Sequence, residues 1–179
     1  MKNLLFICGP NGIGKTTICK EIIRKLPNSA YVDSDPCRLM NPFILNDETI
    51  PTIAKNVSDL IINYMDCSVI ETVIFSYGFH GRRGEVFEKV MKAVSERDLN
   101  FIPFLLVCSE EENIKRMDMD NRSNERKRRA IEESRKAFDD ISYPQIDITA
   151  FSVSEAAENI IKKAGLLYDN NELNWSTYQ

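Results

Sequence analysis

Short apolar runs alternate with longer amphipathic stretches along the whole chain. The runs carry few polar residues, as do strands of a parallel sheet that is covered on both faces. The longer stretches have apolar residues at helical spacing. The pattern predicts strands at residues 3–8, 29–33, 68–76, 101–108 and 145–151. It predicts helices at residues 15–26, 50–65, 83–97, 109–119, 127–140 and 152–165.

The order of these elements predicts an α/β fold, with five parallel strands in one sheet and helices on both of its faces. Right-handed crossovers leave few topologies open for such a chain. The length of 179 residues, without an internal repeat or a linker, fits one domain over residues 1–179. Residues 166–179 are expected to form a loosely held C-terminal tail.

Local signals mark where several helices begin and end. Thr49 is expected to cap the start of the helix at 50–65. Ser152 and Glu155 have the spacing of a capping box, in which each side chain accepts a hydrogen bond from the backbone N–H of the other residue. Gly165 is expected to end the last helix in a left-handed conformation.

Composition narrows the classes of function. The net charge of −4 argues against nonspecific binding to nucleic acid or to an anionic membrane. No stretch approaches the ~20 apolar residues of a membrane span, and the opening MKNLLFIC has too short an apolar core for a secretion signal. Five cysteines without a CxxC spacing fit reduced thiols and a cytoplasmic location.

The segment FICGPNGIGKTT, at residues 6–17, matches G-x-x-x-x-G-K-[ST] between a predicted strand and a predicted helix. In this context the motif forms a phosphate-binding loop. Glycines let backbone N–H groups surround an anion, and the helix start adds its own N–H groups. Lys15 would reach the β- and γ-phosphates of a nucleoside triphosphate, and Thr16 would bind Mg²⁺. The nucleotide-binding candidates are Gly9, Pro10, Asn11, Gly12, Ile13, Gly14, Lys15, Thr16 and Thr17.

Other classes of nucleotide-binding protein find less support. A GTPase would carry an N-K-x-D motif that reads guanine, and the sequence has none. A motor ATPase places an acidic residue at the end of a core strand. Here the candidates Glu71 and Glu110 fit other roles, inside a strand and in the first turn of a helix.

Two carboxylates follow the second predicted strand. Asp33 and Asp35 stand at its carboxyl end, where parallel sheets bind ligands. One would support Mg²⁺ through water while the other accepts the proton of an attacking hydroxyl, and the sequence leaves open which does which. Asp35 is the candidate metal residue beside Thr16. The alternative is a simple turn before Pro36, which loses weight next to a phosphate-binding loop.

With G-x-x-G-x-G-K-T followed by D-S-D, the chain resembles the small P-loop kinases of the shikimate kinase and gluconate kinase group. Its D-x-D…NPF segment is also similar to uncharacterised bacterial nucleotide-kinase-like proteins. The resemblance implies a three-layer P-loop NTPase fold with strand order 2-3-1-4-5, a mobile lid, and phosphoryl transfer from ATP to a small molecule. It also implies catalytic roles for Lys15, Asp33 and Asp35.

The resemblance extends to an acceptor site. In FSYGFHGRRGE, at residues 75–85, Arg82 or Arg83 fits the place where gluconate-type kinases present arginine to the acceptor. Arg38 is expected to line the same pocket, and His80 is expected to be a surface or structural residue. Shikimate kinases carry a glycine triplet after the third strand, which this chain lacks, so shikimate itself is not expected as the acceptor.

The segment DNRSNERKRRAIEESR, at residues 120–135, gathers six cationic residues in an acidic protein. The related kinases carry their lid at this place, which gives an expected lid at about 118–130. Arg122 and Arg126 are the candidates for neutralising charge on the transferred phosphoryl group. Arg116, on the preceding helix, would stack on adenine or brace the lid. The alternative is a solvated helix face, in which arginines pair with glutamates four residues further on.

The sequence therefore predicts an ATP- and Mg²⁺-dependent phosphotransferase. Its partners would be a nucleoside triphosphate and a small acceptor (a nucleoside or nucleotide, a sugar acid or an antibiotic-like hydroxyl compound), with no nucleic acid and no membrane. A catalytically silent nucleotide-binding regulator is the alternative, and the presence of Lys15, Thr16 and both aspartates counts against it. The identity of the acceptor and the choice between monomer and homodimer stay open.

Overall fold

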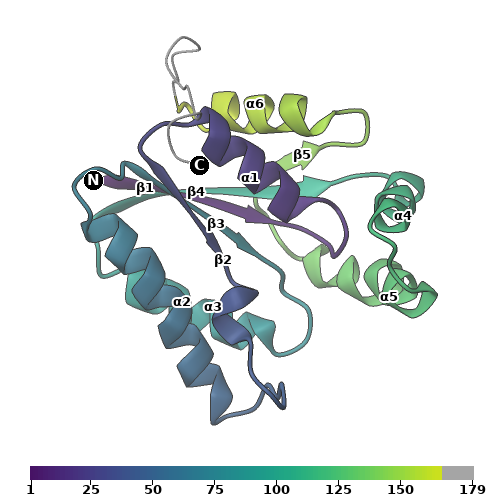
Figure 1. Cartoon of the computed structure of the whole chain (residues 1–179), viewed down its shortest axis with the longest axis horizontal. Coiled ribbons are helices and arrows are strands. Elements are labelled where there is room, and N and C mark those ends of the chain that lie inside the picture. The colour runs from purple at the N-terminus through teal and green to yellow at the C-terminus, as the bar shows by residue number, and fades with distance from the viewer. Residues whose placement is uncertain (167–179) are drawn as a thin grey trace.

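The computed structural model describes residues 1–166, which form a five-stranded sheet surrounded by helices (Figure 1). All neighbouring strands are parallel, and their order is β2-β3-β1-β4-β5. The predicted order 2-3-1-4-5 is therefore confirmed. The strands are β1 (Lys2–Cys8), β2 (Ser29–Asp33), β3 (Thr72–Tyr77), β4 (Leu99–Val107) and β5 (Gln145–Asp147).

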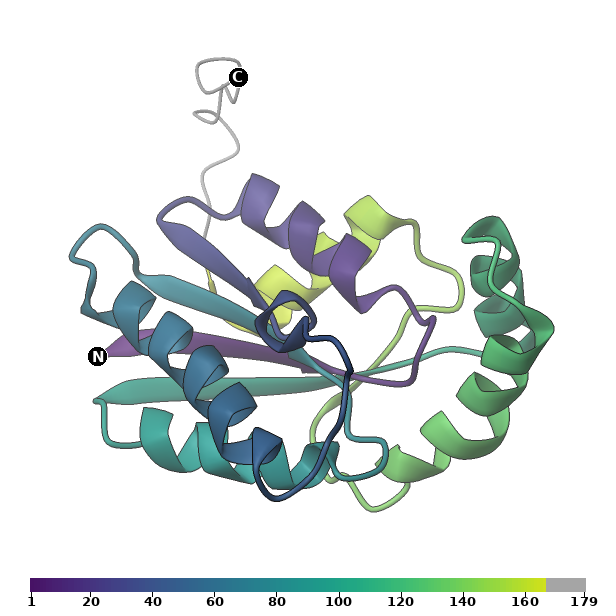
Figure 2. The same ribbon diagram turned by 60° about the horizontal axis from the view of Figure 1, so that its bottom comes forward.

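Helices cover both faces of the sheet, as predicted. Leu4 and Phe6 of β1 face one core with α2 and α3, whereas Leu5 and Ile7 face the other core with α1 and α6. The two helices α4 and α5 lie beyond the carboxyl ends of the strands (Figure 2). The helices are α1 (Lys15–Lys25), α2 (Thr49–Asp66), α3 (Arg83–Val94), α4 (Glu110–Met119), α5 (Asn124–Arg129) and α6 (Val153–Lys163).

Two strands are shorter than predicted because local turns interrupt the apolar runs. β3 begins at Thr72 and not at residue 68, since the N–H of Ile70 donates to the carbonyl of Cys67 and closes a turn there. β5 ends at Asp147, whose carboxylate accepts hydrogen bonds from the N–H and the hydroxyl of Thr149. This side-chain turn competes with further strand pairing.

The predictions for helix ends are confirmed for α6 and wrong for the start of α2. Ser152 and Glu155 form the expected capping box, and Gly165 has a φ of +68°. Thr49, however, already lies inside α2. The side-chain oxygen of Asn46 accepts the N–H groups of Glu48 and Thr49 instead, because it sits one turn earlier.

The helix predicted over 127–140 is divided in the structure. After α5 the chain forms a π-helical turn at Ala130–Ser134 and then a 3₁₀ turn at Lys136–Phe138. The irregular backbone places the buried Ser134 hydroxyl 2.9 Å from the backbone N–H of Asn11, from which it accepts a hydrogen bond. A distant contact thus replaces regular helix geometry.

The predicted tail at 166–179 lies outside the described residues, apart from Leu166. Within residues 1–166, the helices are too short or too polar to cross a membrane.

Candidate nucleotide and acceptor site

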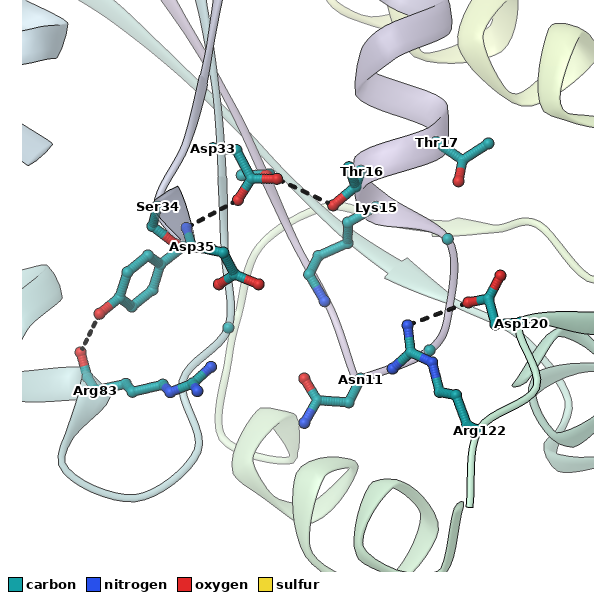
Figure 3. A pocket seen from close by; sticks show the side chains of 15 residues that line it. Asn11, Lys15, Thr16, Thr17, Asp33, Ser34, Asp35, Arg83, Asp120 and Arg122 are labelled. Atoms are coloured by element: carbon teal, nitrogen blue, oxygen red, sulfur yellow. Dashed lines mark hydrogen bonds and ion pairs between the residues drawn. The ribbon is translucent and has the colours of Figure 1, made fainter. Parts of the chain in front are cut away.

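A cavity of about 360 Å³ lies at the carboxyl ends of β1, β2 and β3, in front of the first turn of α1 (Figure 3). We call it the central cavity. Ligands of open parallel sheets bind at this edge. Its walls are formed by Asn11, Gly12, Gly14, Lys15, Thr16, Thr17, Asp33, Ser34, Asp35, Ser76, Tyr77, Gly78, Arg83, Asp120 and Arg122.

The loop between β1 and α1 needs glycine for two reasons. Gly12 has a φ of +78°, and a Cβ there would come within 2.3 Å of Cγ of Met117 on α4. Gly14 has a φ of +107° and precedes α1 without a side-chain cap, so the first N–H groups of the helix remain available. The loop is thus shaped to bring backbone N–H groups to one point, as an anion site requires.

Lys15 carries a buried amine at this point. Its Nζ donates hydrogen bonds to the carbonyls of Gly9 and Pro10, at 2.7 and 2.9 Å. Burial lowers the pKa of Lys15 to about 8, because the interior disfavours the charged form. The amine is therefore held ready for an anion that enters the central cavity.

Asp33 is fixed at the end of β2 by hydrogen bonds to both carboxylate oxygens. Oδ2 accepts the hydroxyls of Thr16 and Tyr31, at 3.3 and 3.2 Å. Oδ1 accepts the backbone N–H of Asp35 at 3.0 Å. The Tyr31 hydroxyl also lies 2.8 Å from the Ser76 hydroxyl on β3. This carboxylate is held in one orientation beside the start of α1.

The sequence reasoning missed Tyr31 and Ser76. The sequence carried a signal for Tyr31, which is two residues before Asp33 on one strand and so shares its face. Ser76 is the register partner of Asp33 on β3, which only the fold shows.

Asp35 is less restrained than Asp33. Its side chain is 70% exposed and forms an ion pair with Arg38. In Figure 3 its carboxylate points into the central cavity, toward Lys15. The two aspartates therefore differ in freedom, although only one residue separates them.

A second hollow, of about 720 Å³, opens beside the central cavity and shares Asn11, Asp35, Arg83, Asp120 and Arg122 with it. We call it the arginine hollow. Besides these shared residues, its walls contain Arg38, His80, Arg126, Arg129, Glu133 and Ser134.

The two candidate lid arginines occupy different places. Arg122 forms an ion pair with Asp120 at 3.2 Å and borders both hollows, whereas Arg126 borders the arginine hollow. Other cations of the segment are paired at the surface. Arg128 pairs with Glu132 at 2.6 Å, as on a solvated face, while Arg129 pairs with Glu125.

Arg82 and Arg83 diverge, although they are adjacent. Arg82 pairs with Asp47 and Glu85 at the surface and does not border the central cavity or the arginine hollow. Arg83 borders both.

His80 lies in the wall of the arginine hollow, with its Nδ1 buried and without a partner among the described residues. Burial and the neighbouring charge of Arg83 lower the pKa of His80 to about 4. The imidazole is therefore neutral at pH 7.

Arg116 braces the loop before α1, and not the segment expected as a lid. Its guanidinium donates to the carbonyls of Ile13 and Ile148, at 2.9 and 2.8 Å, and to Glu112. Arg116 also borders a third hollow of about 300 Å³, with Ile18, Phe151 and Val153 among its walls. We call this the apolar hollow.

Ser134 and Asn113 support the loop from the other side. Ser134 accepts the N–H of Asn11, and the side-chain amide of Asn113 donates to the Asn11 carbonyl at 3.3 Å. Both side chains are buried. The sequence reasoning did not find them, because only the tertiary fold brings these segments together.

No family model and no curated protein matches the sequence. Solved structures do match it over nearly its whole length. The tunicamycin resistance protein of Deinococcus radiodurans has a TM-score of 0.62 and 18% identity, over 94% of this chain and 98% of its own. A gluconokinase from Sinorhizobium meliloti 1021 has a TM-score of 0.59 and 14% identity, over 98% of each chain. An unliganded sugar kinase from Janibacter sp. HTCC2649 has a TM-score of 0.57 and 14% identity, over 92% of each chain.

The chain has the fold of these proteins. The five-stranded parallel sheet in the order 2-3-1-4-5 is that of the P-loop NTPase fold, as the resemblance to shikimate and gluconate kinases implied.

Proposed function

We propose that this protein is a kinase that transfers the γ-phosphoryl group of ATP to a hydroxyl of a small molecule. One observation carries the proposal: Lys15, Thr16, Asp33 and Asp35 converge on one cavity in front of the first turn of α1. A cationic amine, free N–H groups and two carboxylates are the groups that phosphoryl transfer needs. The likeness to solved structures named as a gluconokinase and a sugar kinase supports it.

The nucleotide would span two of the hollows. Its phosphates would lie in the central cavity, against the N–H groups of Gly14 and Lys15 and the Lys15 amine. Its base would enter the apolar hollow between Ile18, Phe151 and Arg116, whose walls are largely apolar. Gly12, Gly14 and Thr17 border both hollows and would connect the two parts.

Mg²⁺ would be held by Thr16 and Asp33, together with phosphate oxygens of the substrate. The donor set fits, since a hydroxyl and a carboxylate oxygen lie 3.3 Å apart at the cavity wall. No cluster of three His, Cys, Asp or Glu side chains suited to a metal occurs within residues 1–166, so protein groups alone would not hold the ion. When bound, Mg²⁺ would neutralise charge on the phosphates.

We propose Asp35 as the base and Asp33 as the residue on the metal side, which reverses the sequence expectation that Asp35 is the metal residue. Asp33 has both oxygens engaged by hydrogen bonds, whereas Asp35 pairs with Arg38 through Oδ1 alone and its carboxylate points into the cavity. Asp35 would take the proton of the acceptor hydroxyl, and the oxygen of that hydroxyl would form the new bond to the γ-phosphorus. The bond from this phosphorus to the β–γ bridging oxygen breaks, and ADP leaves.

Arg122 borders the central cavity and would neutralise the charge that spreads over the transferred group, whereas Arg126 borders the arginine hollow and not the central cavity. We propose that residues 118–130, which carry both, act as a lid. Five free thiols suit a protein of a reducing compartment such as the cytoplasm.

The test is a coupled ADP-release assay over nucleosides, nucleotides, sugars, sugar acids and aminoglycoside- or nucleoside-type antibiotics. We expect at least one compound to stimulate ADP release above background hydrolysis, and we expect Lys15→Ala to abolish the stimulation. Tight ATP binding without stimulation by any class would contradict the kinase and favour a nucleotide-binding regulator.

A further inference from the structure

Arg83 carries a half-buried guanidinium that forms no ion pair with the described residues; Asp35, the carboxylate that acts on it electrostatically, is itself paired with Arg38. Its side chain forms no hydrogen bond or ion pair with another residue in the part of the chain that the structure describes. Other guanidinium groups around the hollow, those of Arg38, Arg122 and Arg129, each have a carboxylate partner. Burying a charge without a partner is costly, so an unpaired buried cation indicates a site where an anion binds.

The environment of Arg83 makes this cost larger. Burial and the charge of Arg38 lower the pKa of Arg83 to about 10. The residue is also held in place, since the buried Tyr77 donates its hydroxyl to the Arg83 carbonyl at 3.1 Å. The hydrogen bond fixes the backbone of Arg83 at the start of α3, from which its side chain reaches the hollow.

The arginine hollow has an excess of positive charge. Two of the five arginines that border it, Arg83 and Arg126, form no ion pair among residues 1–166, whereas the other three are paired with carboxylates. His80 is neutral at pH 7. A phosphomonoester, which carries a charge of about −1.5 to −2 at pH 7, matches two unpaired guanidinium groups better than a single carboxylate does.

We propose that the acceptor carries a phosphomonoester group besides the hydroxyl that attacks ATP, and that Arg83, with Arg38 and Arg126, binds this group. The proposal rests on the proposed kinase function. Asp35, which borders the same hollow, would face the acceptor hydroxyl while the arginines hold its phosphate. A volume of about 720 Å³ accommodates a phosphorylated sugar or nucleoside. Arginine suits this role because its planar group binds phosphate through two parallel hydrogen bonds.

The test uses the smallest member of each class of anion. Methyl phosphate and acetate are titrated by calorimetry into the protein saturated with Mg²⁺ and a non-hydrolysable ATP analogue, which occupies the phosphate-binding loop. We expect saturable binding of methyl phosphate, about tenfold or more tighter than that of acetate. Its affinity should fall with rising salt.

Variants locate the anion. We expect Arg83→Met to weaken methyl phosphate binding about tenfold or more, and Arg82→Met, the neighbour that points to the surface, to leave it unchanged. Should Arg83→Met fail to fold, Arg126→Met replaces it, with Arg128→Met as the matched surface control. Three results would overturn the proposal: no saturable binding of methyl phosphate, equally tight binding of acetate, or an unchanged affinity for methyl phosphate in the Arg83→Met or Arg126→Met variant.

Failure of the proposed function would look different. The nucleotide analogue would then not bind, or would bind equally to Lys15→Ala, or ATP would bind without any acceptor stimulating ADP release. The methyl phosphate titration is in that case run on nucleotide-free Lys15→Ala protein, where the loop's own contribution is removed. The comparison of Arg83→Met with Arg82→Met in this background then decides the anion site on its own.

Discussion

The hydroxyl of Thr16 donates to a carboxylate oxygen of Asp33 at 3.3 Å, joining the start of α1 to the end of β2. The contact links the loop before α1 to the last residue of β2, which is separated from β1 by β3 in the sheet. In the function that we propose, Asp33 therefore lies on the nucleotide and metal side of the site, whereas Asp35 faces the acceptor.

Substitutions of Asp33 and Asp35 are predicted to change the kinetics in different ways. Asp35→Asn should lower the turnover rate about 10²–10⁴-fold while the affinity for ATP stays near that of the wild type, because the proton acceptor is lost. Asp33→Asn should instead raise the Mg²⁺ concentration needed for half-maximal rate. Steady-state kinetics at several Mg²⁺ concentrations separate the two, and an exchange of these phenotypes would contradict our assignment.

Tyr31 is predicted to act as a positioning residue. Tyr31→Phe removes the hydroxyl that connects Asp33 with Ser76, so Asp33 gains freedom to turn. We expect the Mg²⁺ requirement to rise and the unfolding free energy to fall by about 1 kcal/mol. Denaturant unfolding and the Mg²⁺ dependence of the rate measure the two effects. A loss of stability with an unchanged Mg²⁺ requirement would leave Tyr31 with a structural role alone.

Lys15 is predicted to make nucleotide binding depend on pH. Burial lowers its pKa to about 8, so above this value the free protein holds a neutral amine, and an entering triphosphate must draw a proton to it. ATP affinity should then fall as the pH rises from 8, by up to about tenfold per pH unit. Calorimetry at pH 9 in buffers of different ionisation enthalpy counts the proton taken up.

The matched control for this effect is Lys15→Met, which should bind ATP weakly and take up no proton through this position. The same shift has a consequence for stability. Because the unfolded chain binds the proton more tightly, the unfolding free energy should rise as the pH increases from 8 to 10.5. Proton uptake at pH 9 that persists in Lys15→Met would assign it to another group.

His80 offers a spectroscopic test of the arginine hollow, since it is the chain's only histidine. Burial, followed by the charge of Arg83, lowers its pKa to about 4. Between pH 6.5 and 4 the unfolded chain binds more protons, so the unfolding free energy should fall as the pH drops through this window. An NMR titration of the imidazole checks the value. A midpoint near 6.5 would mean that the hollow is more hydrated than we describe.

The parts of the fold that follow from local pattern could be predicted from the sequence. Alternating apolar runs and helical stretches gave the strand count and the two-sided covering by helices. The segment Gly9–Thr16 carried enough local information to place the loop between β1 and α1. The strand order came from the resemblance to known kinases.

Features that depend on distant contacts could not be predicted. The helix expected at 127–140 is interrupted where Ser134 meets Asn11, two residues far apart in the sequence. Arg82 and Arg83 are adjacent and identical, yet consecutive residues at a helix start point about 100° apart, and only the fold shows which faces the hollow. Ser76 joined the site through strand register.

The central claim is that the loop before α1 binds the triphosphate of ATP. A crystal structure of the protein with Mg²⁺ and a non-hydrolysable ATP analogue tests it most directly. We expect the β- and γ-phosphates against the backbone N–H groups of residues 12–17 and the Lys15 amine, with Mg²⁺ beside Thr16. A nucleotide bound elsewhere, with this loop empty, would contradict the account.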